Sequence, residues 1–162
     1  MTSPVAQVVT ELAQSLIERG WMLATAESCT GGMIAAACTD LAGSSVWFER
    51  GFITYSNAAK HDSLGVPQQT LKEHGAVSQA VVLAMAAGAC EHSLAQVSVA
   101  VTGVAGPTGG SPDKPVGTVW LGWSVHGQLS SALMHFEGDR AAVRAATVEA
   151  ALQGLLARLP NV

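Results

Sequence analysis

Three side chains in the first half of the chain could together hydrolyse a carboxylic acid derivative. Tyr55 and Lys60 belong to one segment, Thr54–Lys60, and Ser45 lies ten residues before the tyrosine. A serine becomes an effective nucleophile when a neighbour takes its proton, and a buried lysine of lowered pKa can do so. Tyr55 could relay that proton or orient the lysine. If the three meet in the fold, the pattern predicts a serine hydrolase. The residue types alone are more simply explained by a strand tyrosine, a turn serine and a solvated lysine.

A second candidate nucleophile is Ser28, which follows an expected strand and precedes a glycine pair at an expected helix start. Backbone N–H groups at such a start can bind a phosphate or stabilise an oxyanion. An N-cap role for Ser28 or Thr30 explains the same residues, and Glu27 beside them would repel an anion. Cys29 has no adjacent histidine, so we expect a buried structural thiol.

Two further features favour a ligand. Residues 103–115 form a long glycine- and proline-rich loop that could bring bare backbone N–H groups to a bound molecule, but it lacks the Gly-Lys-Ser/Thr ending of a nucleoside triphosphate loop. Arg140 and Arg144 share one face at the start of the last expected helix, where the helix dipole disfavours cations. They could bind the phosphate of a small nucleotide, or form a surface cluster with neighbouring carboxylates.

The elements that must position these residues alternate between helices and buried strands. Helical periodicity predicts helices, and β-branched or alternating apolar residues predict strands. This order, with its terminal hairpin, predicts an α/β fold: a three-layer α/β/α sandwich with a mixed sheet that includes a C-terminal antiparallel hairpin. Without a repeat or linker, we expect a single domain over residues 1–162. The expected helices are 5–19, an alanine-rich helix after 32 that ends near 43, short pieces within 61–75, 78–94 and 139–159, and the expected strands are 21–26, 48–55, 97–102, 116–125 and 129–136.

The composition indicates which kinds of partner the protein can bind. Hydrophobic residues make up 49% of the 162 residues and charged residues only 12%, so we expect a homo-oligomer that covers apolar surface. The net charge of −4 argues against a nucleic-acid partner. The three cysteines lack metal-ligand spacing, which predicts reduced thiols in a cytoplasmic protein without a metal. No apolar run reaches the roughly 18 residues that a membrane span needs, so we expect no membrane association and no targeting segment.

Seven segments, taken together and in order, resemble the CinA C-terminal domain family. Each is unspecific alone, but their order and spacing match from about Val5 to Leu156. The resemblance is to a stand-alone form, without the molybdopterin-binding-like domain that precedes this one in full-length members. The matching segments are Ala26–Gly32, Gly43–Ser45, Thr54–Lys60, Gly75–Ser78, Gly103–Pro107, Lys114–Val119 and Gly138–Arg140.

The resemblance implies an activity and a set of site residues. The expected reaction is hydrolysis of the carboxamide of nicotinamide mononucleotide to nicotinate mononucleotide and ammonia, a step of pyridine nucleotide salvage that needs no cofactor and no metal. By position, Ser45 would be the nucleophile, while Lys60 and Tyr55 would accept and return the proton. Loop residues would bind the substrate or its oxyanion, and Arg140 would bind its phosphate. The expected binding set is Ser28, Thr30, Gly31, Gly32, Thr102, Gly103, Ala105, Gly106 and Arg140.

One position departs from the family pattern, and two other functions stay open. Ala58 stands where the family often has an acidic residue, so a contact of that acid with a ligand or with Lys60 is missing. One alternative is a non-catalytic nucleotide-binding or interaction module linked to competence or DNA damage. The other is a serine amidase acting on a different small amide.

Overall fold

A five-stranded mixed sheet forms the centre of the protein. The structure is a computed structural model that describes residues 2–161. The sheet order is β2-β1-β3-β4-β5; β1 pairs in parallel with β2 and with β3, whereas the β3–β4 and β4–β5 pairs are antiparallel. The strands are β1 (Leu23–Glu27), β2 (Phe48–Ile53), β3 (Val97–Gly103), β4 (Thr118–Val125) and β5 (Gln128–His135).

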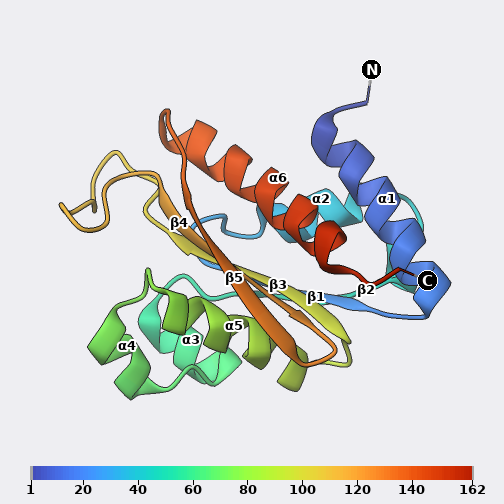
Figure 1. Ribbon diagram of the computed structural model, residues 1–162, viewed down its shortest axis with the longest axis horizontal. Helices are drawn as coiled ribbons and strands as arrows, with labels where there is room; N and C mark the ends of the chain where they lie inside the picture. The colour runs from blue at the N-terminus through green and yellow to red at the C-terminus, as the bar shows by residue number, and fades with distance from the viewer. Residues whose placement is uncertain (1, 162) are drawn as a thin grey trace.

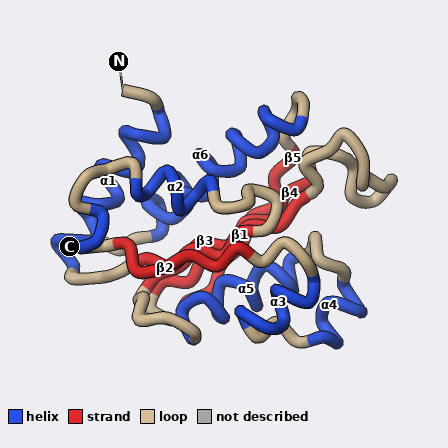
Figure 2. Tube along the Cα trace, turned by 180° about the vertical axis from the view of Figure 1, so that it is seen from behind, coloured by secondary structure: helices blue, strands red, loops and turns tan. Residues whose placement is uncertain are grey.

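Helices cover both faces of this sheet. Figures 1 and 2 show α1, α2 and α6 on one face and α3, α4 and α5 on the other. The expected three-layer α/β/α sandwich with a mixed sheet and a C-terminal hairpin is confirmed. The helices are α1 (Pro4–Arg19), α2 (Met33–Thr39), α3 (Asn57–Leu64), α4 (Gln68–His74), α5 (Gln79–Glu91) and α6 (Arg140–Arg158), with a short 3₁₀ helix, η1 (Ser44–Val46).

Each face of the sheet has its own hydrophobic core. On the side of α1 and α6, Leu12, Leu16 and Leu152 are fully buried against inward-facing strand residues such as Val99. On the side of α5, Val82 and Met85 are fully buried in a second cluster. Every residue of β1 is buried because the strand is covered by helices on both faces and by strands on both sides.

The strand directions bring distant segments to one edge of the sheet. The parallel strands β1, β2 and β3 all end there, and β4 starts there because it runs antiparallel to β3, with Gly103 opposite Val119. β5 ends at the same edge, where Thr118 pairs with His135, and α6 begins five residues later. Ligands bind preferentially outside the carboxyl ends of parallel strands, so this edge is the place to look for a site.

Some expected boundaries differ from the structure. β1 begins at Leu23 rather than Trp21, and α2 ends at Thr39 rather than near residue 43. The larger difference is α3, which already begins at Asn57 because the Ser56 hydroxyl accepts the Ala59 N–H and caps the helix. The second half of the Thr54–Lys60 segment is therefore helical.

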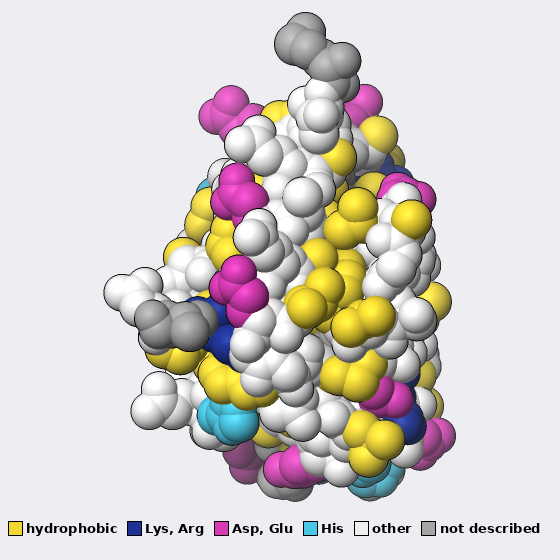
Figure 3. Space-filling model, turned by 90° about the vertical axis from the view of Figure 1, so that its right-hand side faces the viewer, with side chains coloured by type: hydrophobic (Ala, Val, Ile, Leu, Met, Phe, Trp, Pro, Cys, Tyr) yellow, Lys and Arg dark blue, Asp and Glu magenta, His cyan; other side chains and the backbone are white. Residues whose placement is uncertain are grey.

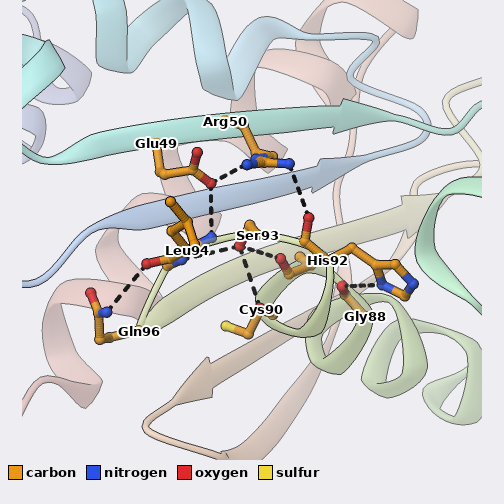
Figure 4. A network of polar contacts seen from close by, with 10 residues as sticks. Glu49, Arg50, Gly88, Cys90, His92, Ser93, Leu94 and Gln96 are labelled. Carbon is orange, nitrogen blue, oxygen red and sulfur yellow. Dashed lines mark hydrogen bonds and ion pairs between the residues drawn. The ribbon is translucent and has the colours of Figure 1, made fainter.

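A polar network ties the start of β2 to the loop between α5 and β3 (Figure 4). The Glu49 carboxylate accepts hydrogen bonds from Arg50 Nε at 2.7 Å and from the Leu94 N–H at 3.1 Å. Arg50 also donates to the His92 carbonyl at 3.1 Å. This edge of the fold lies at the far end of β2 from the carboxyl edge of the sheet.

The surface carries exposed apolar side chains. On the side of the molecule that Figure 3 shows, hydrophobic side chains gather in a band with acidic side chains around it. No helix in residues 2–161 combines the length and apolar composition needed to cross a membrane. Large hydrophobic residues exposed over the described surface include Ile17, Val46, Ile53, Leu94, Leu129 and Leu133.

Candidate active site

Ser28 and Lys60 meet at the carboxyl edge of the sheet. Lys60 Nζ lies 3.0 Å from Ser28 Oγ, and both side chains are buried. Ser28 directly follows β1, and its N–H continues the ladder by donating to the Val101 carbonyl of β3. Lys60 comes from the first turn of α3, which starts just beyond the end of β2. Because β1 and β2 are parallel neighbours, their carboxyl ends place these two residues side by side.

The surroundings of Lys60 make its ammonium group easier to deprotonate. Its side chain is only 1% exposed, and this burial lowers the pKa of Lys60 from 10.5 to about 8. Besides Ser28 Oγ, Nζ contacts the carbonyl oxygens of Thr54 at 2.9 Å and Tyr55 at 3.1 Å. Carbonyls only accept hydrogen bonds, so a neutral amine directs its two hydrogens to them. Its lone pair then faces the Ser28 hydroxyl, as a general base requires.

Glu27 shapes the turn that follows Ser28. Its carboxylate is fully buried and accepts from Thr30 Oγ1 at 2.6 Å, the Ile34 N–H at 2.8 Å and the Ala35 N–H at 3.0 Å. It thus caps the start of α2 and points away from Ser28, so the repulsion expected from the sequence is not directed at the site. The glycine pair in this turn has positive φ, +58° at Gly31, a conformation that glycine adopts without strain.

Ser28 and Lys60 lie in a cavity of about 360 Å³. Its walls come from the turn after β1, the end of β2, the α4–α5 connection, the loop after β3 and the start of α6. Arg140 and Lys60 give it two cationic groups, and none of the described lining residues is acidic, so the cavity suits an anionic ligand. The lining is Ser28, Cys29, Tyr55, Lys60, Ala76, Val77, Thr102, Gly103, Val104, Ala105, Gly106, Thr108, Gly109 and Arg140.

Tyr55 and Arg140 form a bridge at the mouth of this cavity. The phenol oxygen of Tyr55 accepts from Arg140 Nη2 at 3.2 Å, and Arg140 Nη1 donates to the Gly106 carbonyl at 2.8 Å. The Tyr55 side chain is exposed. Among the described residues, Lys60 contacts the backbone carbonyl of Tyr55 and not its phenol. The structure thus joins the tyrosine to Arg140, whereas the sequence suggested a phenol in contact with the lysine.

Ser45 is the predicted residue that the structure does not bring to the site. It lies exposed in η1, before the start of β2, whereas Lys60 follows the end of that strand. The six residues of an extended strand separate these ends by roughly 17 Å. In residues 2–161, Lys60 Nζ has Ser28 as its serine neighbour, so the expected contact between Ser45 and Lys60 is not formed.

Most of the expected binding residues do reach the cavity. Ser28, Thr102, Gly103, Ala105, Gly106 and Arg140 line it, while Thr30, Gly31 and Gly32 build the turn behind it. Ala58 lies elsewhere, in a hollow beside α4. Ala76 and Val77 of the Gly75–Ser78 segment and Thr108 of the 103–115 loop also line the cavity, although none of the three was predicted individually as a binding residue. Thr102 Oγ1 donates to the Ala76 carbonyl at 2.9 Å and holds that connection at the cavity.

Two other chemistries find little support in this geometry. Burial raises the pKa of the Cys29 thiol to about 11, so at neutral pH it is a protonated, weak nucleophile. Within residues 2–161, no three His, Cys, Asp or Glu side chains cluster closely enough to hold a metal ion.

Comparisons with known proteins agree on one family. The model of the CinA C-terminal domain matches residues 5–159. The chain is 54% identical over 153 residues to a nicotinamide-nucleotide amidohydrolase PncC of Pseudomonas putida, covering 94% of this chain and 96% of that protein. It is 49% identical over 154 residues to the protein of that name from Escherichia coli K12, covering 94% and 93%. Its fold is similar to the crystal structure of the competence/damage inducible protein CihA from Agrobacterium tumefaciens, with a TM-score of 0.93, 45% identity and coverage of 96% and 95%.

Proposed function

This chain belongs to the CinA C-terminal domain family, and on that premise we propose that it hydrolyses the carboxamide of nicotinamide mononucleotide to nicotinate mononucleotide and ammonia. Relatives about half identical to it over nearly their whole length bear the name of an amidohydrolase for nicotinamide nucleotides. The observation that carries the proposal is the buried contact of 3.0 Å between Ser28 and Lys60. It provides a nucleophile and a base in a cavity suited to an anion.

The first half of the reaction forms an acyl-enzyme. Lys60 Nζ takes the Ser28 proton as Oγ attacks the carboxamide carbon, which gives a tetrahedral intermediate with a negatively charged oxygen. The lysine ammonium then passes the proton to the departing nitrogen, and the C–N bond breaks to release ammonia. The nicotinoyl group remains as an ester on Ser28.

The second half regenerates the enzyme. Lys60, neutral again, takes a proton from a water molecule that attacks the ester carbon, and returns it to Ser28 Oγ as the ester bond breaks. The N–H groups of Cys29 and Thr30 are the nearest backbone donors after the nucleophile, and neither donates to a backbone carbonyl among the described residues. We assign them to the negatively charged oxygen, in the manner of an oxyanion hole.

The substrate phosphate would lie near Arg140. Two of the five N–H groups of this side chain bind Gly106 and Tyr55, which leaves three for a phosphate at the cavity mouth. With Lys60 neutral, Arg140 is the cation that remains in the lining. The amide itself is uncharged, so affinity depends on the phosphate and ribose.

Paired serine variants test the proposal. Purified wild-type protein is incubated with nicotinamide mononucleotide, and ammonia and nicotinate mononucleotide are measured. We expect turnover by the wild type, a loss of at least about a thousandfold in Ser28→Ala, and near wild-type rates in the matched control Ser45→Ala. Absence of turnover by the wild type would refute the activity, and a normal rate in Ser28→Ala would refute the nucleophile. Turnover of another small amide in a substrate panel would reassign the substrate alone.

A further inference from the structure

A second arginine of α6 binds the turn behind Ser28. Arg144 lies one helical turn after Arg140 and is half-buried. Its Nε donates to the Cys29 carbonyl at 3.1 Å, and its Nη2 donates to the Thr30 carbonyl at 3.2 Å. These are the two carbonyls that directly follow the proposed nucleophile.

Arg144 does not itself face the cavity. The described lining of the Ser28 cavity includes Arg140 but not Arg144. Arg144 instead borders a neighbouring hollow with Pro107 and Val116, which shares Ala105 and Arg140 with the Ser28 cavity. Its position therefore does not favour direct contact with the substrate. It acts on the turn after Ser28 through its hydrogen bonds to the Cys29 and Thr30 carbonyls.

The peptide geometry shows what these hydrogen bonds control. In a planar trans peptide, the N–H points opposite to the C=O. Arg144 holds the Cys29 carbonyl, so the Thr30 N–H of the same peptide unit points away from Arg144. The next peptide unit is fixed at both ends as well, since Arg144 binds the Thr30 carbonyl and the Gly31 N–H donates to the Ser28 carbonyl at 3.0 Å.

The turn has a particular need for such a clamp. Gly31 and Gly32 adopt positive φ, and the freedom of Gly31 lets the adjoining Thr30–Gly31 peptide plane rotate, while the Cys29–Thr30 plane before it needs a hydrogen-bond partner of its own. Glu27 fixes the side nearer α2, through Thr30 Oγ1 and the N–H groups of Ile34 and Ala35, and the Thr30 carbonyl accepts from the Met33 N–H at 3.1 Å. Arg144 supplies the donor for the Cys29 carbonyl and a second donor for the Thr30 carbonyl. A positive charge at a carbonyl also polarises its peptide unit, which makes the N–H at the other end a stronger donor.

We propose that Arg144 is a positioning residue that aims the backbone N–H of Thr30 at the oxyanion formed when Ser28 attacks. The inference rests on the proposed role of Ser28 as nucleophile. It assigns different tasks to two arginines of one helix: Arg140 binds the ground-state phosphate, and Arg144 acts through the turn on the transition state.

Kinetics of matched arginine variants test this division. Arg144→Met removes the donors and the charge while keeping an unbranched side chain of similar flexibility. We expect its kcat to fall about 10- to 100-fold, which does not exceed the decrease in kcat caused by removing one oxyanion donor. KM should change by less than about threefold. The midpoint of its pH profile should stay that of the wild type, because Lys60 is untouched. Arg140→Met should show the opposite pattern, a raised KM with a smaller change in kcat.

A conservative variant guards against a merely structural explanation. Arg144→Lys restores a cation and a donor, and we expect a kcat between those of Arg144→Met and the wild type. Thermal unfolding of each variant reports whether the protein is folded. If Arg144→Met does not fold, Arg144→Lys alone decides, and a wild-type kcat in it would overturn the proposal. An Arg144→Met variant that raises KM at unchanged kcat would also overturn it, since that pattern indicates direct substrate binding.

A second probe separates this proposal from the choice of substrate. A fluorophosphonate phosphonylates activated serines: Oγ bonds to phosphorus, the P–F bond breaks to release fluoride, and the phosphoryl oxygen gains negative charge during the attack. Labelling of Ser28, measured by mass spectrometry, therefore does not depend on a nicotinamide nucleotide. We expect Arg144→Met to label at least about tenfold more slowly than the wild type, and Ser45→Ala, a change outside the cavity, to label at the wild-type rate. If the wild type labels but does not deamidate the nucleotide, the substrate is wrong and the labelling rates decide. If it neither labels nor turns over, both proposals fail.

Discussion

The amine of Lys60 is the group whose ionisation should control the reaction. It lies between two carbonyl oxygens and the Ser28 hydroxyl, and burial lowers its pKa to about 8. Only the neutral amine can take the serine proton. At pH 7 about a tenth of the molecules hold it in that form, since each pH unit below the pKa lowers this fraction about tenfold.

The pH profile should therefore have a single rising limb. We expect kcat/KM for nicotinamide mononucleotide to rise about tenfold from pH 7 to a plateau above pH 9, with a midpoint near the pKa of Lys60 of about 8. Tyr55→Phe is the control, because the phenol contacts Arg140 and not the lysine. Its midpoint should be unchanged. A profile flat between pH 6 and 9, or a midpoint that moves in Tyr55→Phe, would contradict a lysine base.

Lys60 could be chosen as a candidate base from its residue type, but the serine that it contacts could not be predicted in this way. Ser45 is closer to it in the sequence than Ser28 is, and an extended strand between them makes this proximity misleading. The positions of the strand ends would have predicted the contact better, because Ser28 follows β1 and Thr54 follows β2. Had the two been placed as parallel neighbours, their carboxyl ends would have paired Ser28 with the segment that carries Lys60.

At the level of elements, the predictable parts are those with a strong local pattern. The apolar periodicity of α1 and the β-branched run of β3 gave bounds within one or two residues of the structure. The start of α3 was missed because Asn57–Lys60 has little apolar periodicity, and only its Ser56 cap indicates a helix. The strand order could not be predicted, because register and neighbours depend on contacts far apart in sequence.

The buried cap at the start of α2 is another element on which the site depends. We expect Glu27→Gln to lower the free energy of unfolding by about 2–3 kcal/mol, because an NH₂ group replaces an oxygen that accepts from buried donors. The turn after Ser28 would shift with it, so kcat should fall as well. Urea denaturation and steady-state kinetics measure the two effects.

Glu49→Gln provides the matched control for that substitution. Glu49 also accepts from a backbone N–H and pairs with Arg50 (Figure 4). The hydrogen bond from Arg50 lowers the pKa of the Glu49 carboxyl. It lies near the surface at the other end of β2, and we expect a loss of less than about 1 kcal/mol with unchanged kcat. Equal effects of the two substitutions would show that the Glu27 cap has no special role.

Across the whole molecule, the site depends on topology more than on any single segment. It draws on the ends of three parallel strands, the α4–α5 connection and the first turn of α6, so residues from Ser28 to Arg140 contribute to one cavity. The composition that suggested self-association corresponds to exposed apolar side chains, such as Val46 and Leu94. A homo-oligomer stays a prediction, which sedimentation equilibrium would test against the monomer mass of 16.6 kDa.

Global stability should also depend on the buried base. The pKa of Lys60 is about 8 in the folded protein but close to 10.5 in the unfolded chain, so between these values the unfolded state binds one more proton. Stability contributed by this group therefore rises with pH from about 8 to 10 and is lost as pH falls back through that range. The full effect is on the order of 3 kcal/mol.

Comparison with Lys60→Met isolates this effect from all other titrating groups. The variant lacks the ionisable amine, so the difference in unfolding free energy, wild type minus variant, should be constant below about pH 7 and increase by a few kcal/mol towards pH 10. Urea denaturation at pH 7, 8, 9 and 10 measures it for both proteins. Parallel pH dependences would mean that Lys60 keeps its ordinary pKa in the folded state, and the lysine would then be charged, and unable to act as the base, at neutral pH.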